Sequence, residues 1–175
     1  MTLIVDLDRT LIDTDLLYKS STGLAKIRPW LLLIYPFWLL RGKGYLKSEI
    51  AKRLELDIPA LPYIQSTIDY IIQRKNSGDE IILATASHKN YALAVAKYLQ
   101  LFDDVMASSK DFNLSGGNKA DKLVKRFGKQ NFDYIGDHAR DLPVWECANL
   151  AILVNPSKRV IQKTQHLNTL ILSTK

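Results

Sequence analysis

Short apolar runs alternate with helical patterns along most of this 175-residue chain. The first run begins at Leu3 and has no polar residue before Asp6, which is typical of a strand buried on both faces of a parallel sheet. Five further runs follow at residues 81–84, 105–107, 132–135, 151–154 and 169–172. Strands that alternate with helices predict an α/β fold with a parallel, doubly wound sheet and right-handed crossovers.

The helices expected between these strands cover residues 90–98, 119–127 and 142–148, with a basic helix in the tail. A helix should also start within residues 12–17, and apolar residues at helical spacing predict two more at 42–56 and 64–74. We therefore divide the chain into a core domain, residues 1–18 and 75–175, and a helical cap, residues 19–74, inserted after the first strand.

The cap contains eleven consecutive apolar residues from Trp30 to Leu40, counting Pro36. A helix of that length extends about 16 Å, roughly half of the apolar core of a bilayer, so it does not span one. Pro29 suits a first helical position, and Pro36 predicts a break in the middle. Basic residues and tryptophans near both ends are typical of a segment in a membrane interface; a hairpin buried in the cap or against another domain is the alternative.

The formal net charge of +6 at pH 7 indicates the kind of partner that the protein would attract, such as anionic lipid, nucleic acid or a phosphorylated substrate. The sequence contains no nucleic-acid motif, so we expect no nucleic-acid partner. The single cysteine cannot form an internal disulfide, which suits a reducing cytosol. We expect a cytoplasmic protein, at the inner face of the membrane if residues 30–40 contact lipid, and the sequence leaves its oligomeric state open.

Acids, a hydroxyl and a lysine stand at the ends of the predicted elements. They are Asp6 and Asp8 after the first strand, Thr85 at the end of the second, Lys119 at the start of a helix, and Asp137 and Asp141 after the run at 132–135. Ligand sites in open α/β sheets lie beyond the carboxyl ends of strands, so we expect these residues to meet.

The residue types in this set indicate a reaction. Clustered carboxylates repel one another unless a cation neutralises them, and a cluster without His or Cys suits Mg²⁺. A lysine and a hydroxyl suit phosphate oxygens, and a carboxylate can attack phosphorus. The set therefore predicts phosphoryl transfer. Two alternatives stay open: Asp6 and Asp8 as a plain acidic turn, and Lys122, one helical turn later, in place of Lys119.

The order Asp-Leu-Asp-Arg-Thr-Leu at residues 6–11, Leu-Ala-Thr-Ala-Ser at 83–87, a downstream lysine, and Gly-Asp-His-Ala-Arg-Asp at 136–141 resembles the four motifs of the haloacid dehalogenase (HAD) superfamily. The resemblance implies a three-layer Rossmannoid fold with a small helical cap after the first motif. Arg9 stands where glycine is usual, which should alter the loop but removes no catalytic group. Asp8 implies a phosphatase or phosphotransferase, since dehalogenase members lack that acid.

The same resemblance implies a role for each residue. Asp6 would be the nucleophile and a Mg²⁺ ligand, and Asp8 the general acid/base with its backbone carbonyl on the metal. Lys119 would stabilise the charge of the transferring phosphoryl group. The other metal ligands would be Asp137 and Asp141, and the substrate-binding residues would be Thr85, Ala86, Arg9 and Thr10.

A narrower resemblance is to the HAD domains that precede UbiA-family membrane prenyltransferases. It rests on Leu-Ile-Asp-Thr-Asp at residues 11–15, the apolar cap, and the runs at 132–137 and 141–145. These similarities together predict a Mg²⁺-dependent phosphohydrolase that forms an aspartyl-phosphate, acting on a phosphorylated small molecule or a lipid or prenyl-linked phosphate. A regulatory module beside a membrane prenyltransferase, and a phosphotransferase or mutase, are the alternatives.

Overall fold

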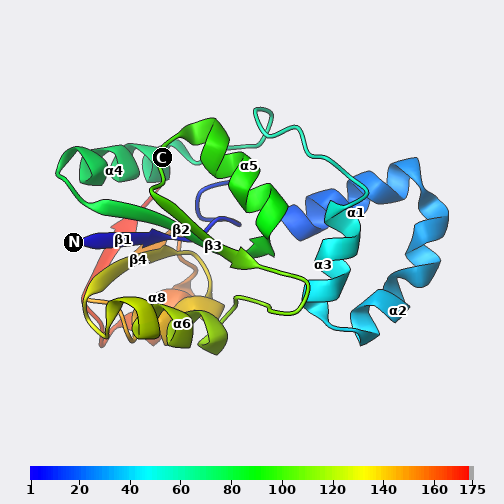
Figure 1. The fold of residues 1–175 in the computed structure, drawn as a ribbon. Helices are drawn as coiled ribbons and strands as arrows, with labels where there is room; N and C mark the ends of the chain where they lie inside the picture. The colour runs from blue at the N-terminus through cyan, green and yellow to red at the C-terminus, as the bar shows by residue number, and fades with distance from the viewer. Residues whose placement is uncertain (174–175) are drawn as a thin grey trace.

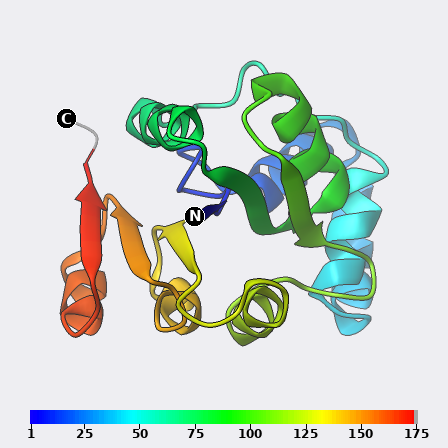
Figure 2. The same ribbon diagram turned by 60° about the vertical axis from the view of Figure 1, so that its left-hand side comes forward.

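The structure is a computed structural model that describes residues 1–173. Six parallel strands form one sheet in the order β3-β2-β1-β4-β5-β6 (Figures 1 and 2). The strands are β1 (Thr2–Val5), β2 (Glu80–His88), β3 (Asp104–Ser108), β4 (Phe132–Gly136), β5 (Leu150–Val154) and β6 (Thr169–Leu172). The predicted parallel, doubly wound sheet is confirmed.

Helices cover both faces of this sheet and also form a lobe at one end (Figure 1). They are α1 (Leu16–Ile27), η1 (Pro29–Ile34), α2 (Tyr35–Leu40), α3 (Lys43–Ala51), α4 (Gln65–Asn76), α5 (Lys89–Leu99), α6 (Gly117–Phe127), η2 (Ala139–Asp141), α7 (Leu142–Trp145) and α8 (Lys158–Thr164). Figure 2 shows α4 and α5 on one face of the sheet and α6 and α8 on the other, which gives three layers.

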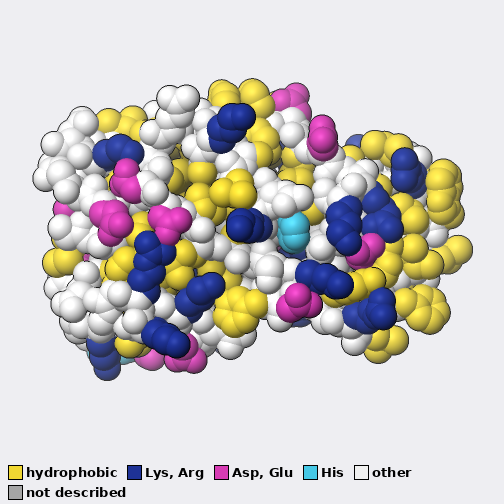
Figure 3. Space-filling model, viewed as in Figure 1, with side chains coloured by type: hydrophobic (Ala, Val, Ile, Leu, Met, Phe, Trp, Pro, Cys, Tyr) yellow, Lys and Arg dark blue, Asp and Glu magenta, His cyan; other side chains and the backbone are white. Residues whose placement is uncertain are grey.

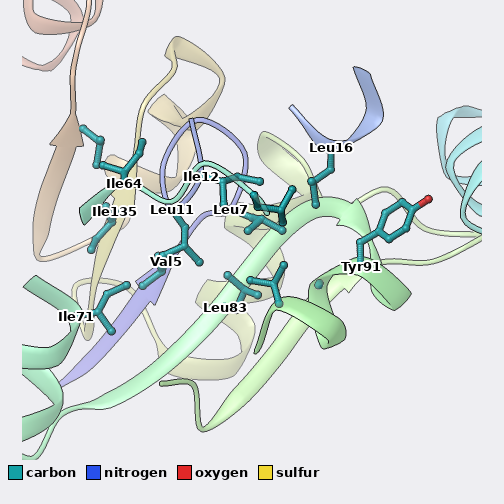
Figure 4. Close-up of a cluster of buried hydrophobic side chains, with 14 of the residues drawn as sticks. Val5, Leu7, Leu11, Ile12, Leu16, Ile64, Ile71, Leu83, Tyr91 and Ile135 are labelled. Carbon is teal, nitrogen blue, oxygen red and sulfur yellow. The ribbon is translucent and has the colours of Figure 1, made fainter. Parts of the chain in front are cut away.

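The strand β1 explains why the first apolar run does not alternate with polar residues. Side chains alternate between the two faces of a strand. Leu3 and Val5 pack into one core cluster with Ile71 of α4, whereas Ile4 packs into the opposite cluster with Trp145 of α7. The side chains of Leu3, Ile4 and Val5 are all fully buried. Figure 4 shows the first cluster, in which strand and helix side chains fill the space between the layers.

The lobe consists of α1, η1, α2 and α3 and has a small core of its own, formed by Leu24, Trp38 and Ile50. In Figure 1 it stands at the end of the molecule, beyond the carboxyl end of β1. The helix α4, most of which falls within the predicted cap of residues 19–74, instead packs Ile71 against the sheet, as does Ile64 just before the helix. The helix α4 therefore belongs to the layers around the sheet, because its apolar side chains contact the sheet cluster and not the core of the lobe.

The structure locates the ends of two predicted elements. The first helix begins at Leu16, inside the predicted range of residues 12–17, because Ile12 pairs with Tyr63 in an isolated bridge and Asp15 caps the helix by accepting a hydrogen bond from the Tyr18 amide at 3.0 Å. The strand β2 continues past Thr85 to its end at His88, with an irregular register against β3 between these residues.

The apolar segment is divided where the sequence predicts. η1 has Pro29 in its first turn, and α2 has Pro36 in its first turn, so the second proline separates two short helices. Over residues 1–173, no helix combines the length and the apolar character needed to cross a membrane.

Candidate active site

The nucleophile candidate Asp6 lies at the carboxyl end of the central strand β1. Its amide donates to the carbonyl of Ile135 at 3.0 Å, which continues the β1–β4 ladder by one residue. One oxygen of its carboxylate, Oδ1, accepts a hydrogen bond from the Leu7 amide at 2.8 Å. Because β4 is the neighbouring strand, the loop after it brings Asp137 and Asp141 to the same edge of the sheet.

Three carboxylates meet at this edge. One oxygen each from Asp6, Asp137 and Asp141 lie within 4.8 Å of one another. Burial, followed by the nearby charges of Asp141 and Asp8, raises the pKa of Asp6 to about 7, while Lys119 opposes the shift. Burial and Asp141 likewise raise the pKa of Asp137 to about 6. Such repulsion is relieved by a cation, and an all-oxygen donor set fits Mg²⁺.

Lys119 places a buried positive charge beside the cluster. Its ammonium group lies 3.1 Å from Asp6 Oδ1 and 3.9 Å from Asp141 Oδ1, and its side chain is 2% exposed. It donates a hydrogen bond to the hydroxyl of Tyr134 at 2.7 Å. The alternative, Lys122, instead places its ammonium over the Phe112 ring, 5.1 Å from the ring centre. The structure therefore brings Lys119, and not Lys122, to the carboxylates.

Asp8 lies beside the carboxylate cluster but its side chain does not join it. Oδ1 accepts a hydrogen bond from the Leu16 amide at 2.7 Å, and Oδ2 accepts one from the Ser87 hydroxyl at 2.6 Å. Burial raises the pKa of Asp8, and these two hydrogen bonds oppose the rise. The contact predicted between Asp8 and the metal runs through its backbone carbonyl and stays a prediction.

The four predicted substrate-binding residues surround this edge in different ways. Thr85 is fully buried, and its hydroxyl oxygen accepts a hydrogen bond from the Ser87 amide at 2.9 Å. The Thr10 hydroxyl donates to Asp137 Oδ1 at 3.4 Å. Arg9 is exposed and has a φ of 58°, a left-handed conformation that favours the glycine it replaces in the motif.

The fourth predicted substrate-binding residue, Ala86, contacts a lysine that the sequence did not predict as part of the site. Its carbonyl accepts a hydrogen bond from the ammonium of Lys47 at 2.5 Å, and Lys47 also donates to Asn113 Oδ1 at 3.1 Å. Lys47 comes from α3, so the lobe reaches the end of β2 through this side chain. A pocket at this junction is lined by Leu17, Ser20, Lys47, Ser87, His88 and Tyr91.

Tyr134 is a second residue that the sequence did not predict. It lies fully buried in β4, and its hydroxyl donates to Asp141 Oδ1 at 2.9 Å while accepting from Lys119. A signal existed, because a tyrosine in a strand buried on both faces needs a partner for its hydroxyl. The sequence could not show that this partner would be the lysine and an acid of the cluster.

Sequence comparisons give a relative but no family. No family model matches the chain. The uncharacterized protein y4nM of Sinorhizobium fredii is 37% identical over 153 residues, which are 87% of this chain and 29% of that protein. The chain thus spans less than a third of the length of this curated relative.

Solved structures share the fold. A protein of unknown function from Bordetella pertussis has a TM-score of 0.72 at 16% identity, with 98% of this chain and 97% of that chain covered. A HAD-family hydrolase of Salmonella enterica serovar Typhi has a TM-score of 0.68 at 15% identity, with 93% and 65% covered. A phospho-aspartyl intermediate analogue of phosphoserine phosphatase has a TM-score of 0.64 at 16% identity, with 97% and 92% covered. The chain therefore has the Rossmannoid fold of HAD-family hydrolases.

Proposed function

We propose that this protein is a Mg²⁺-dependent phosphohydrolase that acts on phosphate monoesters through an aspartyl-phosphate on Asp6. The observation that carries the proposal is the carboxylate cluster of Asp6, Asp137 and Asp141 with the buried ammonium of Lys119 3.1 Å from Asp6. Phosphoserine phosphatase, whose structure as a phospho-aspartyl intermediate analogue has the same fold, supports the choice of intermediate.

The first step transfers the phosphoryl group to the protein. A carboxylate oxygen of Asp6 attacks phosphorus, the bond from phosphorus to the ester oxygen breaks, and the leaving oxygen takes a proton from Asp8. Lys119 stabilises the charge on the phosphoryl oxygens, and the Thr85 hydroxyl forms a hydrogen bond with the phosphoryl group. Mg²⁺ held by Asp6, Asp137 and Asp141 would neutralise negative charge on the substrate and nucleophile.

The second step regenerates the carboxylate. Asp8, now ionised, takes a proton from a water molecule, whose oxygen attacks phosphorus as the bond between phosphorus and Asp6 breaks. The products are inorganic phosphate, free Asp6 and protonated Asp8, so protons balance over the cycle. The burial that raises the pKa of Asp8 favours the protonated acid that the first step requires. The hydrogen bond from Ser87 orients the acid.

The test is phosphate release from p-nitrophenyl phosphate with Mg²⁺ or with EDTA. Wild type should turn over only with Mg²⁺, and Asp6→Asn should lose more than about a thousandfold in kcat because the amide cannot attack phosphorus. Asp13→Asn is the matched control, since Asp13 is exposed and has no place in the cluster. Full activity in Asp6→Asn, or turnover that EDTA does not reduce, would contradict the proposal.

A finer part of the proposal concerns the substrate, which we infer to be a lipid or prenyl-linked phosphate. The exposed apolar residues of η1 and α2 support this, since they lie on the same lobe that reaches β2 through Lys47. A panel of soluble sugar phosphates and prenyl phosphates would test it. A higher kcat/KM for the prenyl phosphates supports the inference, and equal or lower values refute it.

A regulatory module within a longer protein is the second candidate. It is supported by the relative of which this chain spans only 29%, and it includes the predicted position beside a membrane prenyltransferase. Folded protein that binds Mg²⁺ without turnover of any phosphate in the panel would favour this candidate. Product analysis by mass spectrometry with sugar phosphates present separates hydrolysis from transfer to an acceptor other than water.

A further inference from the structure

The outer side of the lobe is apolar and exposed. Trp30, Leu33, Phe37 and Leu40 recur at spacings of three and four residues along η1 and α2, and their exposed fractions are 62%, 77%, 66% and 85%. The other large exposed apolar side chains nearby are Leu32, Ile34 and Leu39 of the same segment and Ile27 at the end of α1. These eight side chains form the apolar tip. Scattered exposed apolar residues are ordinary, but a contiguous group marks an interaction surface.

The side chains of the apolar tip are distinct from those that form the core of the lobe. The opposite side of the same segment carries Leu31, Tyr35 and Trp38, which pack with Leu24 and Ile50. The rings of Tyr35 and Trp38 stack with their centres 5.3 Å apart. The segment is therefore two-sided, with one side that holds the lobe together and another that the described chain leaves in solvent.

The charges around the apolar tip are mostly positive. Residues 16–54 contain eight lysines and arginines and a single acid, Glu49. Glu49 already pairs with Lys52 at 2.7 Å and Arg53 at 2.6 Å. The exposed cations that flank the tip in sequence are Lys26, Arg28, Arg41 and Lys43. Figure 3 shows apolar side chains along the outer edge of the lobe with lysine and arginine beside them.

We propose that the apolar tip docks on an anionic lipid surface. Exposed tryptophan, phenylalanine and leucine enter the boundary between headgroups and acyl chains, and the surrounding cations attract acidic headgroups. The excess of cations over acids favours lipid over a second copy of this chain, whose own tip carries the same positive charge. The lobe stands at the end of the molecule in Figure 1, so the tip can meet a flat surface without obstruction by the sheet. The proposal goes beyond the phosphatase function and does not depend on turnover.

Sedimentation of the protein with lipid vesicles tests the proposal. Vesicles of phosphatidylcholine with phosphatidylglycerol should bind wild type, vesicles of phosphatidylcholine alone should bind it less, and added salt should weaken binding. The double variant Leu33→Asp and Leu40→Asp should weaken binding by about tenfold or more, because it places carboxylates at the point of insertion. Both side chains are largely exposed, so the substitutions disturb no packing.

Leu93→Asp is the matched control, since Leu93 is exposed on α5 outside the lobe. It should bind the vesicles as wild type does. The proposal is wrong if the double variant binds like wild type, if the control loses as much binding, or if wild type binds neither kind of vesicle. A lipid-free dimer that the double variant converts to a monomer would assign the tip to a second copy instead.

Two further measurements separate this proposal from the phosphatase function. Circular dichroism should show that the double variant is folded, and its turnover of p-nitrophenyl phosphate, a soluble ester without a lipid chain, should match that of wild type. Wild-type protein that binds anionic vesicles without hydrolysing any phosphate would refute the phosphatase and leave the docking surface established. Turnover without vesicle binding would refute the docking surface and support the phosphatase.

Discussion

The ammonium of Lys119 on α6 donates a hydrogen bond to the hydroxyl of Tyr134 on β4 at 2.7 Å, and both side chains are buried. The same hydroxyl donates to Asp141 at 2.9 Å. A buried ammonium needs partners, and Tyr134 is a neutral one that still leaves Lys119 within 3.1 Å of Asp6. Tyr134 therefore positions Lys119 between two acids of the cluster without neutralising it.

The change Tyr134→Phe should lower kcat for p-nitrophenyl phosphate by about tenfold or more while KM changes little. The ring stays in the core, but Lys119 and Asp141 lose the hydroxyl between them, so the ammonium shifts toward the acids and away from the phosphoryl group. The unsatisfied groups should also cost about 1–3 kcal/mol of unfolding free energy. Steady-state kinetics and urea unfolding measure the two effects.

Tyr63→Phe separates the positioning role from a general loss of stability. The Tyr63 hydroxyl donates to the carbonyl of Ile58 at 3.0 Å, which is a bond outside the carboxylate cluster. This variant should lose about 0.5–1.5 kcal/mol of stability and keep its kcat. If Tyr134→Phe has wild-type kcat, or if both variants lose activity equally, Tyr134 does not position Lys119.

The sequence predicts the sheet well because burial on both faces leaves a clear pattern. Leu3, Ile4 and Val5 contact helices on alternate sides, so all three must be apolar, and polar residues can begin only at Asp6. Residues that follow such runs necessarily gather at one edge of a parallel sheet. For that reason, the acids of the cluster could be proposed from their positions along the chain alone.

What the sequence does not show depends on contacts between distant residues. The sequence leaves the start of the first helix open over residues 12–17, and the helix begins only at Leu16 because Ile12 pairs with Tyr63, fifty-one positions later. Lys47 is ordinary in sequence and gains its place at Ala86 only when the lobe docks. The sequence likewise does not show whether the apolar tip is exposed, since an apolar run is also compatible with a buried hairpin.

The pH dependence of stability should reveal the carboxylate cluster in metal-free protein. The pKa of Asp6 rises to about 7 and that of Asp137 to about 6 in the folded state, from an ordinary value of 3.8. The folded state then binds more protons than the unfolded state between about pH 4 and pH 7, so the unfolding free energy falls as pH rises through this window. In EDTA, Asp6 and Asp137 should therefore stabilise the folded protein less, and raise its Tm less, at pH 8 than at pH 5.

Adding Mg²⁺ should reverse this loss, with a Tm increase of several degrees at pH 8 and a smaller one at pH 5. Asp137→Asn supplies the comparison because it removes one of the repelling charges. In EDTA at pH 8 this variant should be more stable than wild type, and Mg²⁺ should raise its Tm less. A metal-free Tm that is unaffected by Asp137→Asn would show that the cluster carries no such repulsion.

Lys47→Met should move the alkaline limb of the kcat profile to higher pH. Burial raises the pKa of Asp8, and the nearby charge of Lys47 opposes that rise. Without this charge the pKa of Asp8 rises further, so Asp8, the proposed general acid, stays protonated to higher pH. Lys52→Met is the control, since Lys52 is exposed and pairs with Glu49. Profiles of p-nitrophenyl phosphate hydrolysis that coincide for wild type and Lys47→Met would argue against Asp8 as the acid.

Arg74→Met should reduce stability strongly and leave the chemistry intact. Arg74 on α4 pairs with Asp79 and with Asp133 at 2.8 Å, and Asp133 is buried in β4. Removing the guanidinium leaves the Asp133 carboxylate buried with a hydrogen bond from the side-chain amide of Asn149 at 2.9 Å but without its opposite charge, so the loss should be about 3–5 kcal/mol. Urea unfolding measures this loss, and kcat well below the Tm should stay within about twofold, since the pair lies outside the carboxylate cluster.

The pair of Arg126 with Asp104 provides the comparison, because both side chains are about two-fifths exposed. Arg126→Met should cost less than about 1 kcal/mol, as solvent screens exposed pairs. Combining Arg74→Met with Asp133→Leu should recover part of the stability, because the second change removes the uncompensated buried carboxylate. Equal losses for the two arginine variants, or no recovery in the double variant, would mean that α4 is held to the sheet by apolar packing through Ile71 alone and that the charge pair adds nothing.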